Sequence, residues 1–429
     1  MNKIFIKALF LFIVFIGIND SFAGNSARRK ITGIIISGNE RTKDLVITRE
    51  LLFTVGDAPS DTLLEFSKNR LLALGLFSRV EFYYLPSEGG VDLLILVHEQ
   101  LQFFPYPIFD IADRDWGKIT YGFGVAHVNF MGLNHKLNAA MAFGYHAGFS
   151  FNYKIPWLGL KKHMYFNSVA RKFQSRNRAE NFPEDHLKFS VSLGKFWTRY
   201  FYTIIVPYYD RIRVSSVDAP YMSSSTSVDH LTGISFGVGY DSRDLAYYPS
   251  RGLRTMVALV RNGLFTEYLD YWKYQVDLRK YQTFGAFTFA GRVSTTQSVG
   301  SLPIYDRVYL GYGERIRGHF YEINEGRNNV IAQFETRFTL MKIRYYALPA
   351  PDFVPSYMMR NLKFGLNGAF FVETGEVWIH SDELRFNHLI SGFGASLIVR
   401  FPYVEILRFD LAFDEQFNEQ FIFELGMAF

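Results

Sequence analysis

The chain has 429 residues, no cysteine and a net charge of +5 from 46 basic and 41 acidic residues. Without cysteine it has no disulfide framework and no lipid-anchored cysteine, and so small and dispersed a charge gives no indication of nucleic-acid binding. Aromatic residues make up 18%, including 44 Phe and 27 Tyr, and the mean hydropathy is zero. This composition is unusual for a soluble domain and typical of a chain with lipid-facing and water-facing surfaces.

The first residues predict export. Lys3 and Lys7 precede an apolar run over residues 8 to 18, and a small-x-Ala pattern ends at Ala23. This pattern is typical of a signal peptide over residues 1 to 23, with an uncleaved anchor as the alternative. The run is too short to span a membrane as a helix, and no later stretch reaches ~20 apolar residues, so any membrane domain must cross with strands.

Residues 29 to 99 predict a small α+β domain in the order strand, helix, helix, strand, strand. The expected elements are a strand at 31 to 36, helices at 44 to 52 and 61 to 74, and strands at 80 to 85 and 91 to 99. Ser60 or Asp61 is a suitable cap for the second helix. The expected apolar face of that helix consists of Leu63, Leu64, Phe66, Leu71 and Leu74.

Residues 100 to 429 predict a mainly β fold, an antiparallel transmembrane barrel of about sixteen strands, because alternating segments of ~10 residues are separated by polar turns. An even strand number places the long loops opposite the amino-terminal domain; these loops are 173 to 185, 214 to 229, 298 to 327 and 375 to 388. The Tyr- and Pro-rich connection 341 to 361 is long on the other side, and the pattern does not explain it. The expected strands cover 103–112, 117–130, 135–145, 148–158, 163–172, 186–197, 200–213, 230–241, 252–262, 271–284, 286–297, 328–340, 362–373, 389–400, 404–413 and 420–429.

The last predicted strand alternates apolar and smaller residues and ends on an aromatic carboxy terminus. A terminal apolar strand needs a partner to hold it, which a closed barrel supplies by pairing the last strand with the first; a strand in a soluble sheet is the alternative. The carboxylate of Glu424 belongs with water and sets the register. We expect Phe421, Phe423, Leu425, Met427 and Phe429 to face lipid, and Ile422, Glu424 and Gly426 to face the lumen.

The first predicted strand contains Pro105 and Pro107, each of which removes a backbone donor. We therefore expect it to pair poorly with its neighbours and to form a weak seam with the last strand. The alternative is that the two prolines end a linker and the strand starts later. The residues expected at this gate seam are Pro105, Pro107, Phe421, Phe423, Gly426 and Phe429.

A polar turn follows the strand at 230 to 241. Asp and Arg side chains can pair across such a hairpin, Pro fixes φ, and Gly permits the return into the next strand. The acidic residues are also compatible with a paired-carboxylate or calcium site, but the neighbouring Arg243 and Arg251 favour ion pairing. The motif residues are Asp241, Arg243, Asp244, Pro249 and Gly252.

Two further motifs suggest a contact between a loop and the barrel wall. Arg317 and Gly318 lie in the longest loop, and Glu373 and Gly375 lie at the end of a strand. An arginine inside a barrel needs a carboxylate, and a guanidinium held by two oxygens has a defined geometry. If this loop enters the barrel, as the family resemblance described below implies, we expect Arg317 to pair with Glu373, with Glu314 or Arg315 as further participants. The alternative is a solvated loop arginine and an unrelated wall glutamate.

Catalytic and metal-binding chemistry is not expected. Residues 233 to 237 match G-x-S-x-G, but that motif needs a strand-to-helix turn and here the strand continues to Tyr240. The ten histidines have no zinc-ligand spacing, and the glycines at 122 and 124 lack the helix that a phosphate-binding loop requires. We predict no enzyme activity, no cofactor and no metal.

The motifs resemble those of the BamA/TamA-type outer-membrane assembly superfamily. Residues 31 to 39 resemble the start of a POTRA domain, 71 to 77 its L-x-x-L-G-L-F segment and 91 to 99 its closing strand. The turn at 240 to 252 resembles Y-D-x-R-D-x-x-x-x-P-x-x-G, and the chain ends like the F-x-F-x-x-G-x-x-[FW] pattern. Residues 316 to 319 resemble V-R-G-[FY] with His at the last position, and 371 to 375 resemble F-x-D-x-G with Glu for Asp.

The resemblance implies an outer-membrane barrel with one periplasmic POTRA domain, whereas most of the family carries several. It implies an insertase or translocase that receives unfolded outer-membrane or secreted clients and passes them into the lipid bilayer at the seam, with periplasmic chaperones or lipoproteins as further partners. The alternatives are a secretion channel of the two-partner type and a passive porin or structural barrel. The client, the accessory subunits and the oligomeric state stay open.

Overall fold

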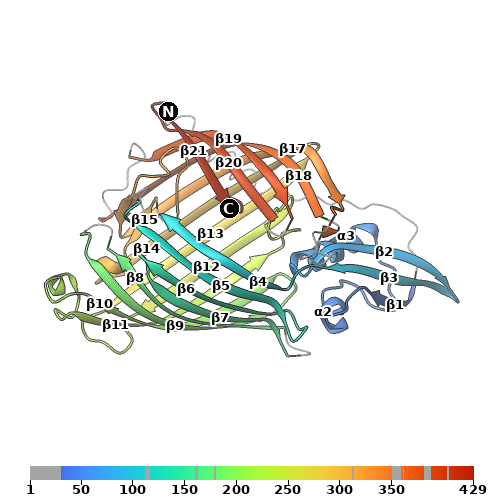
Figure 1. Cartoon of the computed structure of the whole chain (residues 1–429), viewed down its shortest axis with the longest axis horizontal. Helices are drawn as coiled ribbons and strands as arrows, with labels where there is room; N and C mark the ends of the chain where they lie inside the picture. Colours follow the sequence, from blue (N-terminus) through green and yellow to red (C-terminus); the bar gives the residue numbers. More distant parts are fainter. Residues whose placement is uncertain are drawn as a thin grey trace.

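The computed structural model describes residues 30–111, 116–159, 163–177, 180–311, 314–349, 359–360, 362–380, 388–402 and 405–429. The expected signal peptide over residues 1 to 23 lies outside these ranges. The fold is a small amino-terminal α+β unit followed by a 16-stranded antiparallel sheet (Figure 1). No helix in the described ranges is long and apolar enough to cross a membrane.

The amino-terminal unit has the predicted order of elements. They are β1 (Ile31–Ser37), α2 (Asp44–Thr48), α3 (Asp61–Ala73), β2 (Phe77–Ser87) and β3 (Gly90–Glu99). The strand order is β1-β3-β2, with β1 parallel and β2 antiparallel to β3. The first helix is shorter than predicted, because it ends at Thr48.

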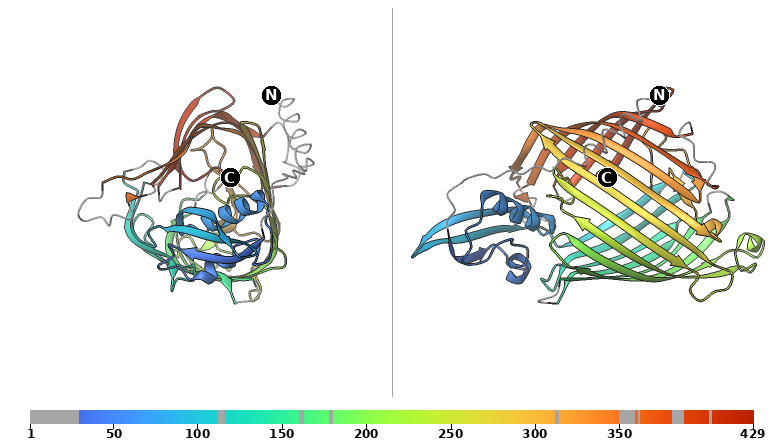
Figure 2. Two further views of the ribbon diagram at one scale, coloured as in Figure 1. Left: turned by 90° about the vertical axis from the view of Figure 1, so that its right-hand side faces the viewer. Right: turned by 180° about the vertical axis from the view of Figure 1, so that it is seen from behind.

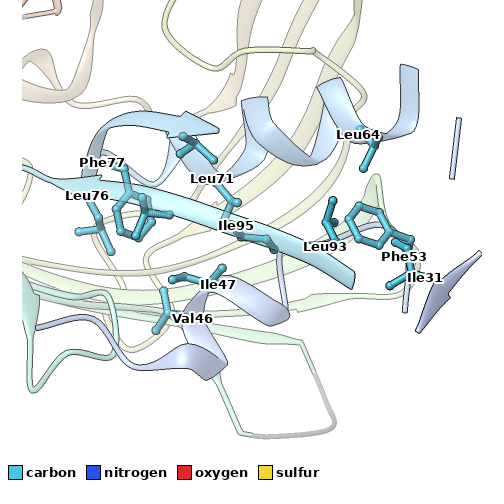
Figure 3. Close-up of a cluster of buried hydrophobic side chains, with 12 residues drawn as sticks. Ile31, Val46, Ile47, Phe53, Leu64, Leu71, Leu76, Phe77, Leu93 and Ile95 are labelled. Carbon is cyan, nitrogen blue, oxygen red and sulfur yellow. The ribbon is translucent and has the colours of Figure 1, made fainter. Parts of the chain in front are cut away.

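The unit has a hydrophobic core between its sheet and its helices (Figure 3). Val46 and Ile47 from α2, Leu71 from α3 and Leu93 from β3 are fully buried. The Ser60 side chain caps α3, where it accepts a hydrogen bond from Leu63 N at 3.3 Å. The predicted apolar face of this helix is wrong at one position, because Phe66 points outward and is 39% exposed.

Every predicted barrel strand corresponds to one strand of the large sheet. The sheet runs β21-β20-β19-β18-β17-β14-β13-β12-β11-β10-β9-β8-β7-β6-β5-β4, and the alternating strand directions put the predicted long loops at the end opposite the amino-terminal unit. The prediction of a long loop over 173 to 185 is wrong, because β8 and β9 stay paired as far as Arg176 and Pro183. The bounds are β4 (Phe103–Ile111), β5 (Ile119–Phe130), β6 (His135–Gly144), β7 (Gly148–Leu158), β8 (Met164–Arg176), β9 (Pro183–Phe196), β10 (Phe201–Arg213), β11 (Val228–Asp241), β12 (Gly252–Asn262), β13 (Tyr271–Phe284), β14 (Phe287–Gly300), β17 (Asn328–Tyr346), β18 (Leu362–Trp378), β19 (Ile390–Phe401), β20 (Glu405–Phe413) and β21 (Glu419–Leu425).

The large sheet has an apolar outer face and a polar inner face. Phe123 and Phe370 point outward and are 60% and 61% exposed, whereas Glu335 and Arg337 of β17 point inward and are buried. This alternation is that of a barrel wall in lipid. The G-x-S-x-G run lies within β11, and Gly233 gives room to the ring of Tyr208, since a β-carbon there would lie 2.5 Å from Tyr208 Cζ.

The amino-terminal unit lies against one end of the sheet, at the rim formed by the short turns (Figure 2). Asn129 Nδ2 donates to Thr42 Oγ1 at 2.9 Å, and Lys43 N donates to the Gly132 carbonyl at 3.0 Å. The Arg49 guanidinium lies 5.2 Å from the centre of the Trp157 ring. These contacts fix the unit to the turn after β5 and to β7.

The sheet is open between its first and last strands. β4 and β21 are its two edges, and no ladder joins them within the described ranges. They stand apart in Figure 1, and the carboxy terminus lies between them. The expectation that residues 420 to 429 pair with the first strand is therefore wrong for this structure.

Candidate functional site: the lumen loop and the strand edges

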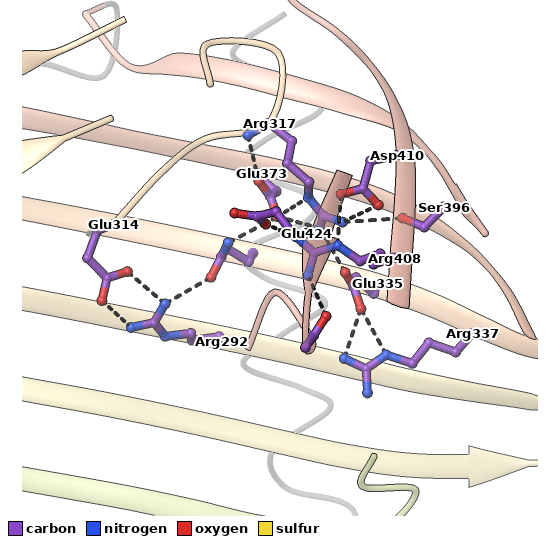
Figure 4. Close-up of polar contacts among 12 residues, drawn as sticks. Arg292, Glu314, Arg317, Glu335, Arg337, Glu373, Ser396, Arg408, Asp410 and Glu424 are labelled. Atoms are coloured by element: carbon purple, nitrogen blue, oxygen red, sulfur yellow. Dashed lines mark hydrogen bonds and ion pairs between the residues drawn. The ribbon is translucent and has the colours of Figure 1, made fainter. Parts of the chain in front are cut away.

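The connection from β14 to β17 folds back against the inner wall. Its short strands β15 (Val308–Leu310) and β16 (Asn324–Gly326) form a two-stranded sheet, and the described residues 314 to 323 make the tip between them. Leu310 and Ile316 are buried against Ile331 of β17. The loop therefore carries Arg317 to the inner face of the strands near the carboxy terminus (Figure 4).

Arg317 lies directly against Glu373. Arg317 Nε donates to Glu373 Oε1 at 2.8 Å, and the backbone N of the same residue donates to Glu373 Oε2 at 2.9 Å. Both residues are at most 2% exposed, and the guanidinium lies 3.6 Å from the centre of the Phe371 ring. The extra methylene of glutamate thus brings one carboxylate to both the side chain and the backbone of the loop.

Two further carboxylates surround the same guanidinium. Arg317 Nη2 donates to Glu335 Oε1 at 2.8 Å, and Nη1 lies 3.6 Å from Asp410 Oδ1. Glu335 also accepts from Arg337 Nε, and Asp410 from Arg408 Nε, each at 2.8 Å. Three arginines and three carboxylates, all at most 2% exposed, therefore form one charge-balanced cluster, which we call the lumen cluster.

Sequence reasoning found two of these six residues and missed four: Glu335, Arg337, Arg408 and Asp410. The missed residues carry a signal, because each is a charge at an inward position of a strand whose alternate positions are apolar or small. In β17 the inward residues Glu335 and Arg337 flank the outward Thr336. Only the packed loop shows which of the inward charges meet.

Glycines allow the loop backbone to touch the wall. Gly318 has φ of +105°, and a β-carbon there would lie 2.5 Å from the Phe413 carbonyl O. A β-carbon at Gly392 of β19 would lie 1.5 Å from the Arg317 carbonyl O. Gly375 makes room for the loop side chain of Ile316, whose Cδ1 would lie 3.3 Å from an added β-carbon. The predicted glycines of the loop and the wall, Gly318 and Gly375, therefore both lie where the loop packs against the wall.

Glu314 and Arg315, the further participants that the sequence allowed, lie beside this site. Glu314 accepts two hydrogen bonds of 2.8 Å from Arg292 of β14, and Arg315 lies 3.6 Å from Glu424 of β21. These residues line a cavity of about 370 Å³ together with three members of the lumen cluster, Arg317, Glu373 and Arg408. The loop thus contacts both β14 and the last strand.

The tip of the loop also contacts the turn that leads into β21. His319 Nε2 lies 2.7 Å from Glu415 Oε2, and Phe320 N donates to Gln420 Oε1 at 3.1 Å. Glu424 pairs with Arg408 of the lumen cluster. The last strand is therefore tied to the loop at both of its ends.

The prolines of β4 lie on its free edge. β4 pairs with β5 without a register shift from Phe103 to Ile111, so the expectation that this strand pairs poorly with β5 is wrong. Val128 N donates to the Gln102 carbonyl at 2.8 Å, and since bonding positions alternate, even-numbered residues of β4 bond to β5. Pro105 and Pro107 therefore remove donors from the edge that faces away from β5.

The free edge of β21 is short. Gly426 N donates to the Ile406 carbonyl at 3.0 Å, so even-numbered residues bond to β20 and odd-numbered residues face the free edge. These are Phe421, Phe423 and Leu425, whose side chains point outward with exposed fractions of 66%, 55% and 67%.

The last residues leave the wall and turn inward. Gly426 has φ of +93° and ends the strand, so the expected lipid-facing positions of Met427 and Phe429 are wrong. Met427 packs beside Ala369 and Ile398 on the inner face of the wall. Phe429 is 6% exposed and packs with Tyr281, 5.5 Å from the Arg337 guanidinium.

The predicted turn motif forms a local ion-pair structure at the rim near the amino-terminal unit. Arg243 donates to both oxygens of Asp241 at 2.9 and 2.8 Å. Asp244 Oδ1 accepts from Ser250 N at 2.8 Å, Pro249 is buried, and Gly252 has φ of +111°. Asp241 and Asp244 thus have separate partners within the turn. Across the described ranges, no group of three His, Asp or Glu residues is arranged to hold a metal ion.

Comparisons with known proteins match both parts of the chain. The Omp85 superfamily domain matches residues 129 to 429, and the POTRA model, described as surface antigen variable number repeat, matches residues 29 to 100. The chain belongs to the Omp85 superfamily. No curated protein sequence matches it significantly.

Solved structures share the fold of this Omp85 chain at low identity. BamA from Haemophilus ducreyi lacking POTRA domains 1 to 3 matches with a TM-score of 0.53 and 15% identity, over 94% of this chain and 84% of that chain. CdiB from Acinetobacter baumannii matches with 0.55 and 14%, over 92% and 73%. CdiB from Escherichia coli matches with 0.53 and 11%, over 95% and 92%. The protein is therefore an outer-membrane β protein with its POTRA domain in the periplasm.

Proposed function

We propose that this Omp85 protein inserts or translocates unfolded polypeptides at the outer membrane, with the edges of β4 and β21 as the working seam and no enzymatic step. The observation that carries this proposal is the pair of unjoined edges in an otherwise fully laddered sheet. An unpaired edge is a template for an incoming strand. The two prolines weaken direct pairing between β4 and β21, since the β4 edge lacks two N–H donors there.

The POTRA domain supplies a second edge for clients. β2 lies at the edge of the three-stranded sheet, and Tyr83 and Leu85 on it are 45% and 38% exposed. A client strand added to this edge would gain main-chain hydrogen bonds without a specific sequence. Periplasmic chaperones or lipoproteins that deliver clients are further partners under this proposal.

A secretion channel of the two-partner type is the second candidate, and the shared fold with the two CdiB structures favours keeping it. A polypeptide that passes through the lumen must displace the loop, and with it the buried Arg317 and Glu373. A client that enters at the seam leaves the loop in place. We favour the seam for this reason. A passive porin would need neither the lumen cluster nor the POTRA domain.

The proposal is tested by reconstitution of the full chain in vesicles with an unfolded outer-membrane barrel as client. We expect the client to become heat-modifiable and protease-resistant faster than in empty vesicles. Depletion in cells should lower the outer-membrane level of several barrel proteins. Loss of one secreted substrate alone, with normal levels of other barrels, would support the secretion channel instead.

A further inference from the structure

The connection between β17 and β18 extends beyond β14, whereas β19 accompanies β18 as far as Gly365. β14 pairs with β17 only as far as Phe338, whereas β17 continues to Tyr346 and β18 starts at Leu362. Residues 339 to 346 therefore extend past the end of β14 on the POTRA side, over roughly 25 Å at about 3.3 Å per residue. We call residues 339 to 346 and 362 to 366 the periplasmic ribbon.

The outer face of the ribbon continues the lipid-facing surface of the barrel. On that surface the Phe338 ring lies 6.2 Å from Phe287 and 5.7 Å from Phe370. Partners across a ladder point to the same side, so the pairs Arg344↔Phe364 and Tyr346↔Leu362, which keep the phase of Phe338↔Gly368, face the same way.

An aromatic cluster marks the level of the membrane surface. The rings of Tyr346 and Phe364 are 5.7 Å apart, and Phe364 lies 5.2 Å from Phe401 at the end of β19. Aromatic residues gather where a barrel passes from hydrocarbon to headgroups. Arg344 pairs with the central ring of this cluster, so its charge lies at headgroup level.

The other face of the ribbon is held by the POTRA domain. Tyr345 has the opposite phase to Arg344, and the Arg79 guanidinium of β2 lies 5.4 Å from the centre of its ring. This contact keeps the ribbon at the rim with its outer face towards the membrane.

The charge of the ribbon has one sign. Between Glu335 and Glu373 the sequence has one acidic residue, Asp352, against Arg337, Lys342, Arg344, Arg360 and Lys363. Within the described part of the chain, neither Lys342 nor Arg344 forms an ion pair with an acidic side chain. Leu340 and Ile343 beside them are 54% and 42% exposed. Basic residues interleaved with apolar and aromatic ones suit an anionic lipid surface.

We propose that the periplasmic ribbon is a binding surface for anionic phospholipid headgroups of the inner leaflet, with Arg344 at the phosphate, Lys342 adding to the positive charge of the rim, and the cluster of Tyr346, Phe364 and Phe401 at the acyl boundary. This assigns a role to the long periplasmic connection and does not depend on client insertion. The surface anchors the rim next to the POTRA domain.

The test uses the full chain folded into phosphatidylcholine vesicles with phosphatidylglycerol. A photoactivatable phosphatidylglycerol or phosphatidylcholine, each with its reactive group near the headgroup, is crosslinked, and the labelled peptides are mapped by mass spectrometry. We expect the phosphatidylglycerol probe to label the ribbon about fivefold more than the phosphatidylcholine probe, as attraction of basic residues to an anionic surface predicts. Equal labelling by both probes, or protection of the ribbon from both, would overturn the proposal.

The variant Lys342→Gln/Arg344→Gln should lower labelling of the ribbon by phosphatidylglycerol to the phosphatidylcholine level. The matched control Arg171→Gln/Lys172→Gln removes two exposed charges from β8 and should leave ribbon labelling unchanged. Lys342→Arg/Arg344→Lys keeps the charge and should keep the label, which separates charge from folding. Retention of lipid selectivity in the Gln variant would contradict the proposal.

Discussion

The two walls beside the open seam differ in how they are filled. The inner face of the wall from β17 to β21 carries the buried lumen cluster, and the loop ties β21 to it through Arg315 and Glu424. The inner face of the wall from β4 to β8 carries polar side chains such as Asn138 and Asn152 that remain partly exposed. The seam therefore lies between a wall that the loop stiffens and a wall that lacks this support. We infer that β4 and its neighbours make most of the motion at the seam.

The largest effect is expected from removal of the central arginine. Arg317→Ala leaves Glu373, Glu335 and Asp410 with one positive charge fewer, and loss of one partner of a buried pair costs about 3–5 kcal/mol. Glu373→Ala should act in the same direction but less strongly, because two other carboxylates remain. Heat-modifiable folding on gels and urea unfolding measure the loss.

Arg315→Ala is the matched control, because the side chain of this loop arginine is 36% exposed and lies 3.6 Å from Glu424, whereas Arg317 is buried. Its effect should be within about 1 kcal/mol. Normal folding and full activity of both Arg317→Ala and Glu373→Ala would contradict a stabilising role for the lumen cluster.

The outer faces of the two walls should behave alike, because lipid contacts both. Phe423→Arg and Phe123→Arg each replace an exposed outward ring, and an arginine near the midplane costs about 2–4 kcal/mol. The lumen-facing change Glu424→Gln keeps the size of the side chain and should cost less. Folding into vesicles at increasing urea compares the three, and equal tolerance at Phe423 and Glu424 would contradict the register of β21.

A smaller effect is expected at the carboxy terminus. Phe429→Ala removes the ring that packs with Tyr281 and should release residues 426 to 429 from the inner wall. We expect a loss of about 1–3 kcal/mol, below the range for a closed core, since the tail lies at the end of the chain. Carboxypeptidase digestion of folded protein should become faster. Unchanged protection would show that Phe429 does not hold the tail.

The smallest effect concerns pH at the turn before β21. The Asn418 side chain, which donates at 2.7 Å, lowers the pKa of Asp414 most; burial opposes this, and the backbone N–H groups of Asn418 and Gln416 add to the lowering. A lowered pKa means that the contribution is present above about pH 4, the ordinary value for aspartate, and is lost as pH falls through the lower folded value. Asp414→Asn should remove this pH dependence, measured by unfolding at pH 3 and 7, and an unchanged slope would contradict it.

The alternating pattern was sufficient to predict all sixteen strands, because a lipid-facing barrel repeats one simple rule along the whole chain. The partnership of Arg317 and Glu373 was predicted from two motifs in the order found in the resembling superfamily, since an arginine inside a barrel needs a carboxylate. The same rule failed at Met427 and Phe429, because alternation assumes that the strand continues and Gly426 ends it. Asp410 and Glu335 lie far from the loop in sequence, and only the folded loop shows that they share one guanidinium.

The pairing of the β4 and β21 edges could not be predicted from the sequence, for a different reason. Pro105 and Pro107 were expected to weaken the whole strand. Both are odd-numbered, however, and remove donors only from the free edge, so the hydrogen bonds to β5 are kept. Which edge is affected depends on the register with β5, in which Pro105 lies opposite Val125 and Pro107 opposite Phe123.

A covalent link across the seam tests the central claim most directly. The chain has no native cysteine, so Phe103→Cys or Phe109→Cys in β4 is combined with Phe421→Cys or Leu425→Cys in β21, several pairs being needed because Cα atoms must come within about 7 Å. The control Phe409→Cys/Phe423→Cys links two partners within an existing ladder. The account predicts that the seam link stops client insertion, that reduction restores it, and that the control inserts normally. Full insertion with the seam completely crosslinked would contradict it.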